Sequence, residues 1–192
     1  SRGPDDKGIW VDNNIYLLHT RLKILDLSKD SSQPMHKDNY VICFNGEIYN
    51  FKKFKLELID KGHSFVSNGD TEILISAWKE WGVSMLKKLD GMFSFVIWDT
   101  ENKNLFLARD RFGEKPLYWG KIKTNIDNKS IFIFSSELSA IWEFPESVKS
   151  INTEAARVFL NYGYVTPPFS IQKGINQLLP GEYISITFEK IN

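Results

Sequence analysis

The sequence predicts an α+β fold with mainly antiparallel strands joined as hairpins, and three observations support this. Runs rich in Phe, Val, Ile and Trp come in pairs separated by a few polar turn residues. Segments with apolar residues at helical spacing lie between these runs. The run FSFVIWD, residues 93–99, is apolar on both faces, which indicates a sheet buried between two other layers.

The first half of the chain is predicted to alternate strands and helices. Residues 15–25 read as extended, and YVICF at 40–44 reads as a second strand. An amphipathic helix is predicted over 50–62, where Asn50 can cap its start and Lys-Gly supplies its end. A second helix is predicted over 70–82, again ended by a glycine.

The second half is predicted to contain two strand pairs and two helices, followed by a last strand. The first pair is joined by a turn at Asp99–Asn104, and the second pair is joined across Thr124–Lys129. The expected elements are strands at 93–99, 104–109, 116–122 and 131–136, helices at 137–142 and 153–162, and a strand at 183–188.

Length and composition favour one globular domain spanning residues 1–192. The chain is 42% hydrophobic and 14% aromatic, enough for a large core, and it has no repeat, low-complexity tract or flexible linker. Lys plus Arg and Asp plus Glu each total 24, so no net positive field favours nucleic acid or anionic lipid. We therefore expect no nucleic-acid partner and no membrane partner.

The lack of a targeting signal, the single cysteine and the scattered histidines predict a cytoplasmic protein without a metal centre. No apolar run approaches the roughly 20 residues that span a bilayer, and the first residues lack a signal-peptide pattern. The single cysteine, Cys43, excludes an internal disulfide framework and suits a reducing compartment. Histidines at 19, 36 and 63 are scattered, so no metal is expected.

The segment VICFNGEIYN, residues 41–50, allows two interpretations of Asn45-Gly46. Asn-Gly between strand-like runs is a strong signal for a type I′ hairpin turn. Alternatively, Gly46 lets a ligand approach its backbone N–H while Asn45 and Glu47 supply side-chain contacts. The segment alone does not decide between them.

Two further polar residues stand out, each with a structural alternative. Arg21 lies in an otherwise apolar strand, where a guanidinium either binds a carboxylate bidentately or forms an ordinary ion pair at a sheet edge. Asp70 follows Asn-Gly and begins a helix, so it is either an N-cap or an anionic contact for an ammonium group. With Glu47, Asn45 and Gly46, they form the set of groups needed to hold an α-amino acid.

Several motifs in order carry a resemblance to a known family. HTRLKILD, QPM, NGEIYN, NGDTEILI, LDGMFSFVIWD and ARDRFGEKPLY together resemble the class II glutamine amidotransferase domain of glutamine-hydrolysing asparagine synthetases. The similarity covers nearly the whole chain. SRGPD at the start resembles the H-R-G-P-D segment of that family, with Ser1 in place of His.

The resemblance implies a fold and a set of site residues. The fold would be of the N-terminal-nucleophile hydrolase type, a four-layer αββα sandwich of two antiparallel sheets, here without its first strand. Arg21 would bind the α-carboxylate of glutamine, assisted by backbone groups near Ile24. Glu47 and Asp70 would bind the α-ammonium group. Asn45 and the N–H of Gly46 would form the oxyanion hole, and Gly46 would lack a side chain so that the oxyanion can approach.

The nucleophile of that family is a cysteine at the mature N-terminus, whose free α-amine acts as the base. Neither Ser1 nor Cys43 is expected to replace it, because Ser1 matches a segment downstream of the catalytic end and Cys43 suits a small core position. We therefore expect an N-terminally truncated glutaminase domain that is inactive on its own.

The resemblance also implies a larger protein. Its glutaminase domain would release ammonia to a linked synthetase domain, not present in this chain, that uses ATP and Mg to amidate aspartate. The glutaminase domain itself would need no cofactor, and a homodimer is a further expectation. Two alternatives remain: a class II amidotransferase that acts on a sugar or another acceptor, and a glutamine-binding or scaffolding module without a nucleophile.

Overall fold

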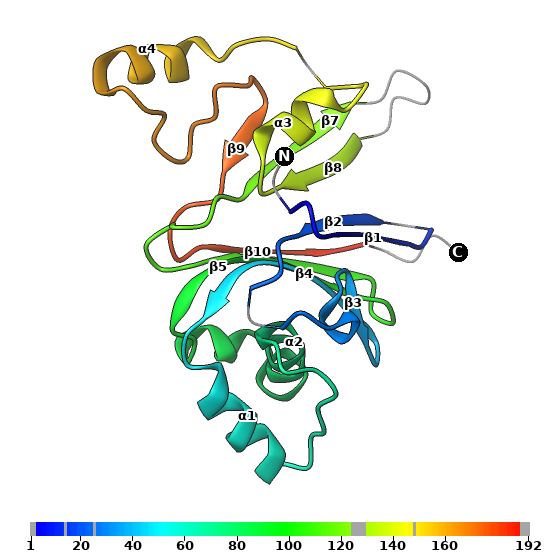
Figure 1. Cartoon of the computed structure of the whole chain (residues 1–192). Coiled ribbons are helices and arrows are strands. Elements are labelled where there is room, and N and C mark those ends of the chain that lie inside the picture. The colour runs from blue at the N-terminus through cyan, green and yellow to red at the C-terminus, as the bar shows by residue number, and fades with distance from the viewer. Residues whose placement is uncertain (1–2, 14, 25, 124–129, 148, 189–192) are drawn as a thin grey trace. The chain divides into compact units, whose positions relative to one another are not determined.

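A computed structural model describes residues 3–13, 15–24, 26–123, 130–147 and 149–188 (Figure 1). The chain forms two compact units. The first contains Ser1–Ala108 and Ile184–Asn192, and the second contains Arg109–Tyr183. The candidate site residues all belong to the first unit.

A five-stranded antiparallel sheet is the centre of the first unit, with strand order β10-β6-β5-β4-β3. Strands β4 and β5 are the longest, and they pair from Tyr40 with Asp99 to Ile48 with Gly91. Consecutive residues are buried along most of β5, so both faces of this central strand are covered, as its continuous apolar run predicts. The strands are β3 (Met35–Lys37), β4 (Tyr40–Ile48), β5 (Gly91–Asp99), β6 (Asn104–Arg109) and β10 (Tyr183–Thr187).

Helices α1 (Phe51–Asp60) and α2 (Asp70–Trp81), with the 3₁₀ helix η2 (Gly82–Lys87), cover one face of this sheet (Figure 1). Residues of β4 and β5 that point to this face pack against the apolar side of each helix. This hydrophobic core includes Ile42, Phe44, Ile48, Phe54, Leu58, Ile73, Leu74, Phe93, Phe95 and Phe106.

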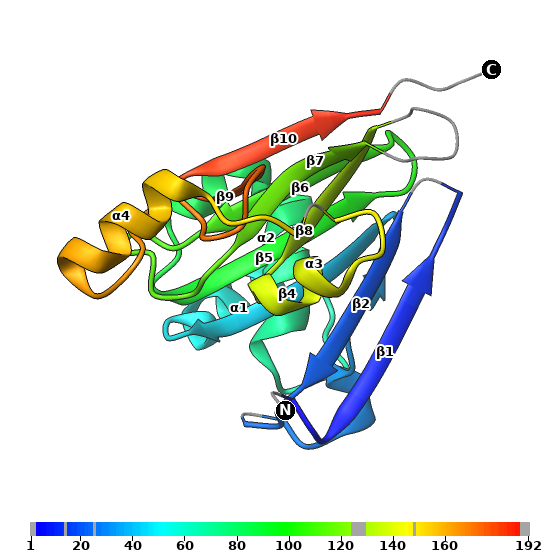
Figure 2. The ribbon, with the colours of Figure 1, turned by 90° about the horizontal axis from the view of Figure 1, so that it is seen from above.

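A two-stranded hairpin, β1 (Asp6–Val11) with β2 (Tyr16–Arg21), completes the first unit together with the short 3₁₀ helix η1 (Lys29–Ser31). The indole N–H of Trp98 on β5 donates to Asp12 in the hairpin turn at 3.0 Å. Figure 2 shows that β2, rather than β1, is the strand of the hairpin nearer to β4. The hairpin therefore places the end of β2 close to the polar part of β4.

The second unit contains a three-stranded sheet with order β8-β7-β9 and two helices. Ile122, Ile141 and Ile175 form its small core. The elements are β7 (Tyr118–Lys123), β8 (Ser130–Ser135), α3 (Leu138–Glu143), α4 (Thr153–Tyr162) and β9 (Ile175–Gln177).

Most predicted elements are confirmed, and the differences have local causes. The strand expected over 15–25 ends at Arg21, because the guanidinium of Arg21 binds carbonyl groups of the chain that follows and holds it as a loop. Asn50 stands at the N-cap but does not cap α1 with its side chain, which instead bonds to Lys88 and Asp90. The expected turn at 124–129 lies outside the described residues.

Five elements of the described structure were not predicted: β1, β3, β9, η1 and η2. The three strands are short or carry charged and polar residues, so their own sequence gives a weak periodic signal. They exist because a neighbouring strand pairs with each of them.

Candidate functional site

Strand β4 runs without interruption through Asn45-Gly46. Asn45 pairs with Ser94 and Gly46 with Phe93 on β5. The hairpin interpretation is therefore wrong, because a type I′ turn would end the strand at this point. Polar residues instead lie inside a buried strand, near its C-terminal end.

Gly46 is required by the packing of β4 against β5. Its φ angle is 152°, and a Cβ atom there would lie 2.1 Å from the carbonyl oxygen of Met92. The packing of β4 against β5 thus requires a glycine without any ligand, and the sequence-based reason, the approach of an oxyanion, stays a prediction. The contact with Met92 does not say which group accepts the backbone N–H of Gly46.

Alternate N–H groups of β4 point to opposite edges of the strand. The backbone N–H of Tyr49 donates to the carbonyl oxygen of Asp90 on the β5 side at 2.8 Å. The N–H groups of the even-numbered residues of β4 therefore point away from β5. On that edge β3 pairs only as far as Ile42. Beyond it, side chains accept the N–H groups of Phe44 and Ile48.

The Gly46 N–H lies between these two on the same edge. Gln33 Oε1 accepts the Phe44 N–H at 2.6 Å, and Asp70 Oδ2 accepts the Ile48 N–H at 3.0 Å. No side chain within the described part of the chain accepts the N–H of Gly46. This edge of β4 therefore presents a fixed backbone donor to a ligand.

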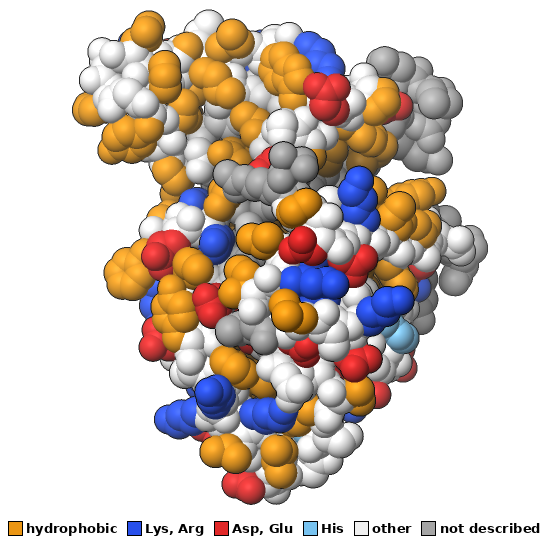
Figure 3. All heavy atoms as spheres, viewed as in Figure 1, with side chains coloured by type: hydrophobic (Ala, Val, Ile, Leu, Met, Phe, Trp, Pro, Cys, Tyr) orange, Lys and Arg blue, Asp and Glu red, His pale blue; other side chains and the backbone are white. Residues whose placement is uncertain are grey.

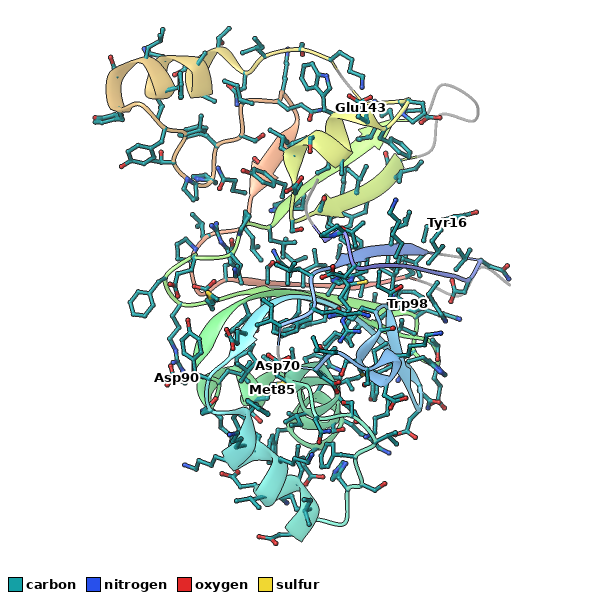
Figure 4. The ribbon with its side chains drawn as sticks, viewed as in Figure 1. Tyr16, Asp70, Met85, Asp90, Trp98 and Glu143 are labelled. Atoms are coloured by element: carbon teal, nitrogen blue, oxygen red, sulfur yellow. The ribbon has the colours of Figure 1, made fainter. Side chains whose placement is uncertain are left out.

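Asp70 is the first residue of α2, and the N-cap is Gly69, so the interpretation of Asp70 as the N-cap is wrong. Its carboxylate reaches β4 instead, and Figure 4 shows it where α2 meets the sheet. Burial raises the pKa of Asp70, the Ile48 N–H opposes that rise, and the charge of Glu47 adds to it.

Glu47 and Asp70 form a pair of neighbouring carboxyl groups at the end of β4. Asp70 is only 7% exposed, and among the residues that the structure describes it has no Lys or Arg partner. Two buried or half-buried anions without a cation are unfavourable. A bound ammonium group would remove that cost.

Arg21 ends β2 and is 6% exposed. Its guanidinium donates to the backbone carbonyls of Ser28 at 2.8 Å and Asp26 at 2.5 Å. No ion pair of Arg21 occurs within the described ranges, and carbonyl groups do not neutralise its charge. Since a guanidinium has five N–H donors, Arg21 retains donors for an anionic ligand.

Asp26 connects the loop after Arg21 to the start of α2. Its carboxylate accepts hydrogen bonds from Ser28, Ser31 and the backbone N–H of Asn68, and these bonds hold its pKa far below the usual range. A Cβ atom on Gly69 would lie 2.8 Å from Ser31 Oγ, so α2 begins directly against this loop. Hydrogen bonds therefore tie the loop that Arg21 binds to the residues just before Asp70.

The other predicted site residues, Asn45, Glu47 and Ile24, have fewer contacts that fix their side chains in the site. Asn45 and Glu47 are half-buried and lie on the face of β4 opposite the helices, as the alternation of the strand predicts. Ile24 lies in the loop after Arg21 and is 64% exposed. No contact among the described residues joins Ile24 to Asn45 or Gly46.

Sequence reasoning assigned no role to His19 or Gln33, although both bind β4. His19 Nε2 lies 3.2 Å from the carbonyl oxygen of Phe44, and Gln33 accepts the N–H of the same residue. Burial lowers the pKa of His19, and nearby Arg21 lowers it further. Only their occurrence in the HTR and QPM motifs singled them out, because contacts across 25 and 11 residues leave no periodic signal.

Cys43 is not an activated thiol. Burial raises its pKa to about 12, whereas a reactive cysteine has a lowered pKa. Ser1, the other residue considered as a nucleophile, lies outside the described residues.

Charge and metal-ligand patterns add no second site. On the face drawn in Figure 3, acidic and basic side chains are interspersed. Within the described residues, no group of three His, Cys, Asp or Glu side chains could hold a metal ion. In that part of the chain, every helix is too short or too polar to cross a bilayer.

Comparisons with known proteins identify the family of the chain. A family model described as "Glutamine amidotransferase domain" matches residues 1–192. Asparagine synthetase [glutamine-hydrolyzing] 3 of Bacillus subtilis is 34% identical over 196 residues, which cover 100% of this chain and 31% of that protein. Amidase chry2 of Gibberella zeae is 35% identical over 192 residues, covering 95% of this chain and 26% of that protein.

Solved structures show the same fold. The glutamine phosphoribosylpyrophosphate amidotransferase of B. subtilis has a TM-score of 0.58 at 21% identity, over 90% of this chain and 32% of its own. This confirms the predicted α+β fold with antiparallel sheets, of the N-terminal-nucleophile hydrolase type. The chain spans about a third of the length of these relatives.

Proposed function

The chain belongs to the glutamine amidotransferase domain family, and from that premise we propose that it forms the glutamine-binding part of a glutaminase. The observation that carries the proposal is the end of β4. There, two carboxyl groups that have no Lys or Arg partner among the described residues lie beside the N–H of Gly46, for which those residues supply no side-chain acceptor. A buried arginine, also without an ion pair in the described part of the chain, binds the loop that Asp26 ties to Asn68.

The α-amino and α-carboxyl groups of glutamine match these charges. Arg21 binds the carboxylate with its remaining N–H donors, assisted by backbone groups near Ile24. Glu47 and Asp70 bind the ammonium group, which offsets the cost of burying the Asp70 carboxylate. Recognition at both charged ends distinguishes a free amino acid from a glutamine side chain within a polypeptide.

Hydrolysis of the glutamine side chain passes through a tetrahedral oxyanion. The amide of Asn45 and the backbone N–H of Gly46 are the donors for it in this proposal. An oxyanion donor of this kind contributes about 3 to 4 kcal/mol to lowering the barrier. The continuous pairing of β4 with β5 supports this role, because it fixes the donors before the substrate arrives.

The attacking thiol is not expected among residues 1–192. Cys43 is their only cysteine, and its thiol remains protonated at neutral pH. We therefore expect the polypeptide Ser1–Asn192 alone to release no ammonia from glutamine. Release of ammonia above the buffer background would contradict this expectation.

The full-length protein is proposed to amidate aspartate in an ATP-dependent, ligase-type reaction, in the cytoplasm. Several relatives that match nearly this whole chain carry the name asparagine synthetase [glutamine-hydrolyzing], and each is about three times as long as the match. A synthetase domain that binds ATP and Mg would receive the ammonia from the glutaminase domain. A homodimer is also proposed.

A second candidate is an amidotransferase of the same class with another acceptor. The similarity to amidase chry2, at 35% identity, favours it, since that protein has a different name from the synthetases. Assays of the full-length protein with aspartate and ATP decide between the two, because only the first candidate forms asparagine.

The binding roles are tested by substitutions in the full-length protein, assayed with glutamine and with free ammonia as nitrogen donors. Arg21→Ala and Asp70→Ala should each raise the KM for glutamine at least about tenfold, as expected for loss of a charged hydrogen bond. Synthesis from ammonia should be unchanged. The exposed residues Asp60 and Arg157 provide matched controls as Asp60→Ala and Arg157→Ala. An equal loss with both nitrogen donors would show that Arg21 and Asp70 are structural.

A further inference from the structure

The backbone of Phe44, the residue before Asn45, is held on both sides by side chains rather than by a strand. At Phe44, Gln33 Oε1 accepts the N–H at 2.6 Å, and His19 Nε2 lies 3.2 Å from the carbonyl oxygen. Strand β3 pairs with β4 only up to Ile42, so no strand supplies these bonds. Both backbone groups of Phe44 therefore depend on His19 and Gln33.

The protonation of His19 follows from its partner. A carbonyl oxygen only accepts hydrogen bonds, so Nε2 must carry the proton and donate it. Burial and the charge of Arg21 both favour the neutral ring. His19 is therefore a neutral Nε2–H donor whose position is set by β2, the strand that ends in Arg21.

Gln33 connects the backbone N–H of Phe44 to the start of α2. Its amide is 8% exposed, and its Nε2 donates to Thr71 Oγ1 at 3.3 Å. Thr71 follows Asp70, whose carboxylate holds the N–H of Ile48. Side chains thus hold β4 two residues before Gly46 and two residues after it.

We propose that His19 and Gln33 are positioning residues for glutamine hydrolysis, which fix the direction of the Gly46 N–H and the Asn45 side chain. This inference rests on the proposed glutaminase function. Gly46 has no Cβ atom and an unusual φ angle, so its own side chain cannot define the orientation of its N–H. The bonds at Phe44 supply that orientation from one side, and the bond at Ile48 supplies it from the other.

The expected effect is on the transition state and not on substrate binding. An oxyanion donor works within 2.7 to 3.1 Å, and a displacement of about 1 Å costs on the order of a hundredfold in rate. Loss of one holding bond should permit part of that displacement. We expect His19→Leu and Gln33→Met each to lower kcat for glutamine hydrolysis by about tenfold, with the KM for glutamine nearly unchanged.

The test uses the full-length protein and two binding probes. Glutamate resembles the ground state, and an aldehyde analogue of glutamine forms a tetrahedral adduct with the thiol nucleophile. The variants should bind the aldehyde about tenfold more weakly and glutamate as well as the unsubstituted protein does. His36→Leu, at an exposed position on β3, is the control, and His19→Gln, which keeps an N–H donor, should restore part of kcat.

The outcomes separate this inference from the proposed function. Unchanged affinity for the aldehyde in both variants, while the unsubstituted protein hydrolyses glutamine, would overturn the positioning role alone. Equal losses with glutamine and with ammonia would also overturn it, since the two residues would then be structural. If the unsubstituted full-length protein did not hydrolyse glutamine, the proposed function and this inference would both fail.

Discussion

Two buried arginines, Arg21 and Arg109, show how similar surroundings can serve different purposes. Each is the last residue of a strand, each is 6% exposed, and each donates to backbone carbonyls, two of them in the loop that follows. Arg21 uses Nη1 and Nη2 for this, with Ser28 and Asp26 as acceptors. Arg109 uses Nε, Nη1 and Nη2, with Lys115, Leu178 and Gly113 as acceptors.

The difference lies in the number of occupied donors and in the neighbouring charge. All three nitrogen atoms of Arg109 are bonded, and the adjacent Asp110 is a fully buried anion whose charge partly offsets the lowering of the Arg109 pKa by burial. Arg21 has an unused nitrogen and no ion pair in the described part of the chain. Burial and residue type therefore do not identify a binding arginine, whereas its remaining donors do.

The largest predicted effect concerns local stability at Arg109. Arg109→Met leaves three carbonyl oxygens without their donor and removes the positive charge beside Asp110, so it should lower the free energy of local unfolding by about 3 kcal/mol. Arg21→Met removes only two bonds to carbonyls and should cost about 1 to 2 kcal/mol. Hydrogen exchange of peptides covering 16–28 and 105–118 in the full-length protein measures both values. Equal losses at the two positions would remove the distinction.

The sequence alone could not separate these two arginines. Both stand at the end of an apolar run, in HTR and in LAR, and the difference appears only when their acceptors are known. Local patterns did predict α1, α2 and the long strands, since each has its own apolar periodicity. The strands β1 and β3 were missed, because each depends on pairing with the next strand of its hairpin and has little apolar periodicity of its own.

The candidate site shows the same limit. The charges at Arg21, Glu47 and Asp70 could be chosen from residue type and from the resemblance of their motifs to a known family. The hydrogen bond from Asn68 to Asp26, which ties the loop after Arg21 to the start of α2, spans 42 residues of sequence and required the structure. Gly46 illustrates a further limit, since the sequence suggested a glycine for ligand approach and the structure shows one required by β5.

A second prediction concerns Asp70, whose buried carboxylate should lower the stability of the fold at neutral pH, whereas Arg109 raises it. Asp70 has a raised pKa, so the folded state binds its proton more tightly than the unfolded state does. Its contribution is then most favourable below 3.8, the ordinary pKa, and is lost as pH rises through the raised value. Asp70→Asn, which keeps an acceptor for Ile48, should therefore be at least as stable as the unsubstituted protein at pH 7 while binding glutamine weakly.

The pH dependence provides the measurement. The melting temperature of the Asp70→Asn variant relative to the unsubstituted protein should rise as pH increases from 3.8 and then level off. Asp60→Asn, at an exposed position, should show no such trend. A variant that becomes relatively less stable as pH rises would mean that Asp70 is held by a cation, which would remove the case for an ammonium site.

The smallest predicted effect concerns Cys43, a buried residue two positions from Asn45 on the same strand. A rise in pKa from 9.0 to about 12 lowers the thiolate fraction at pH 8 by roughly a thousandfold relative to an unperturbed thiol. In the folded full-length protein, peptide mass spectrometry should find Cys43 unmodified by iodoacetamide under conditions that label it fully after denaturation. Cys43→Ala should leave glutamine hydrolysis within about twofold, because among the described residues no hydrogen bond joins its thiol to Asn45, Gly46 or Arg21. Rapid labelling of Cys43 in the folded protein would instead place an accessible thiolate beside the proposed oxyanion donors, and the division between structural and binding residues on β4 would have to be redrawn.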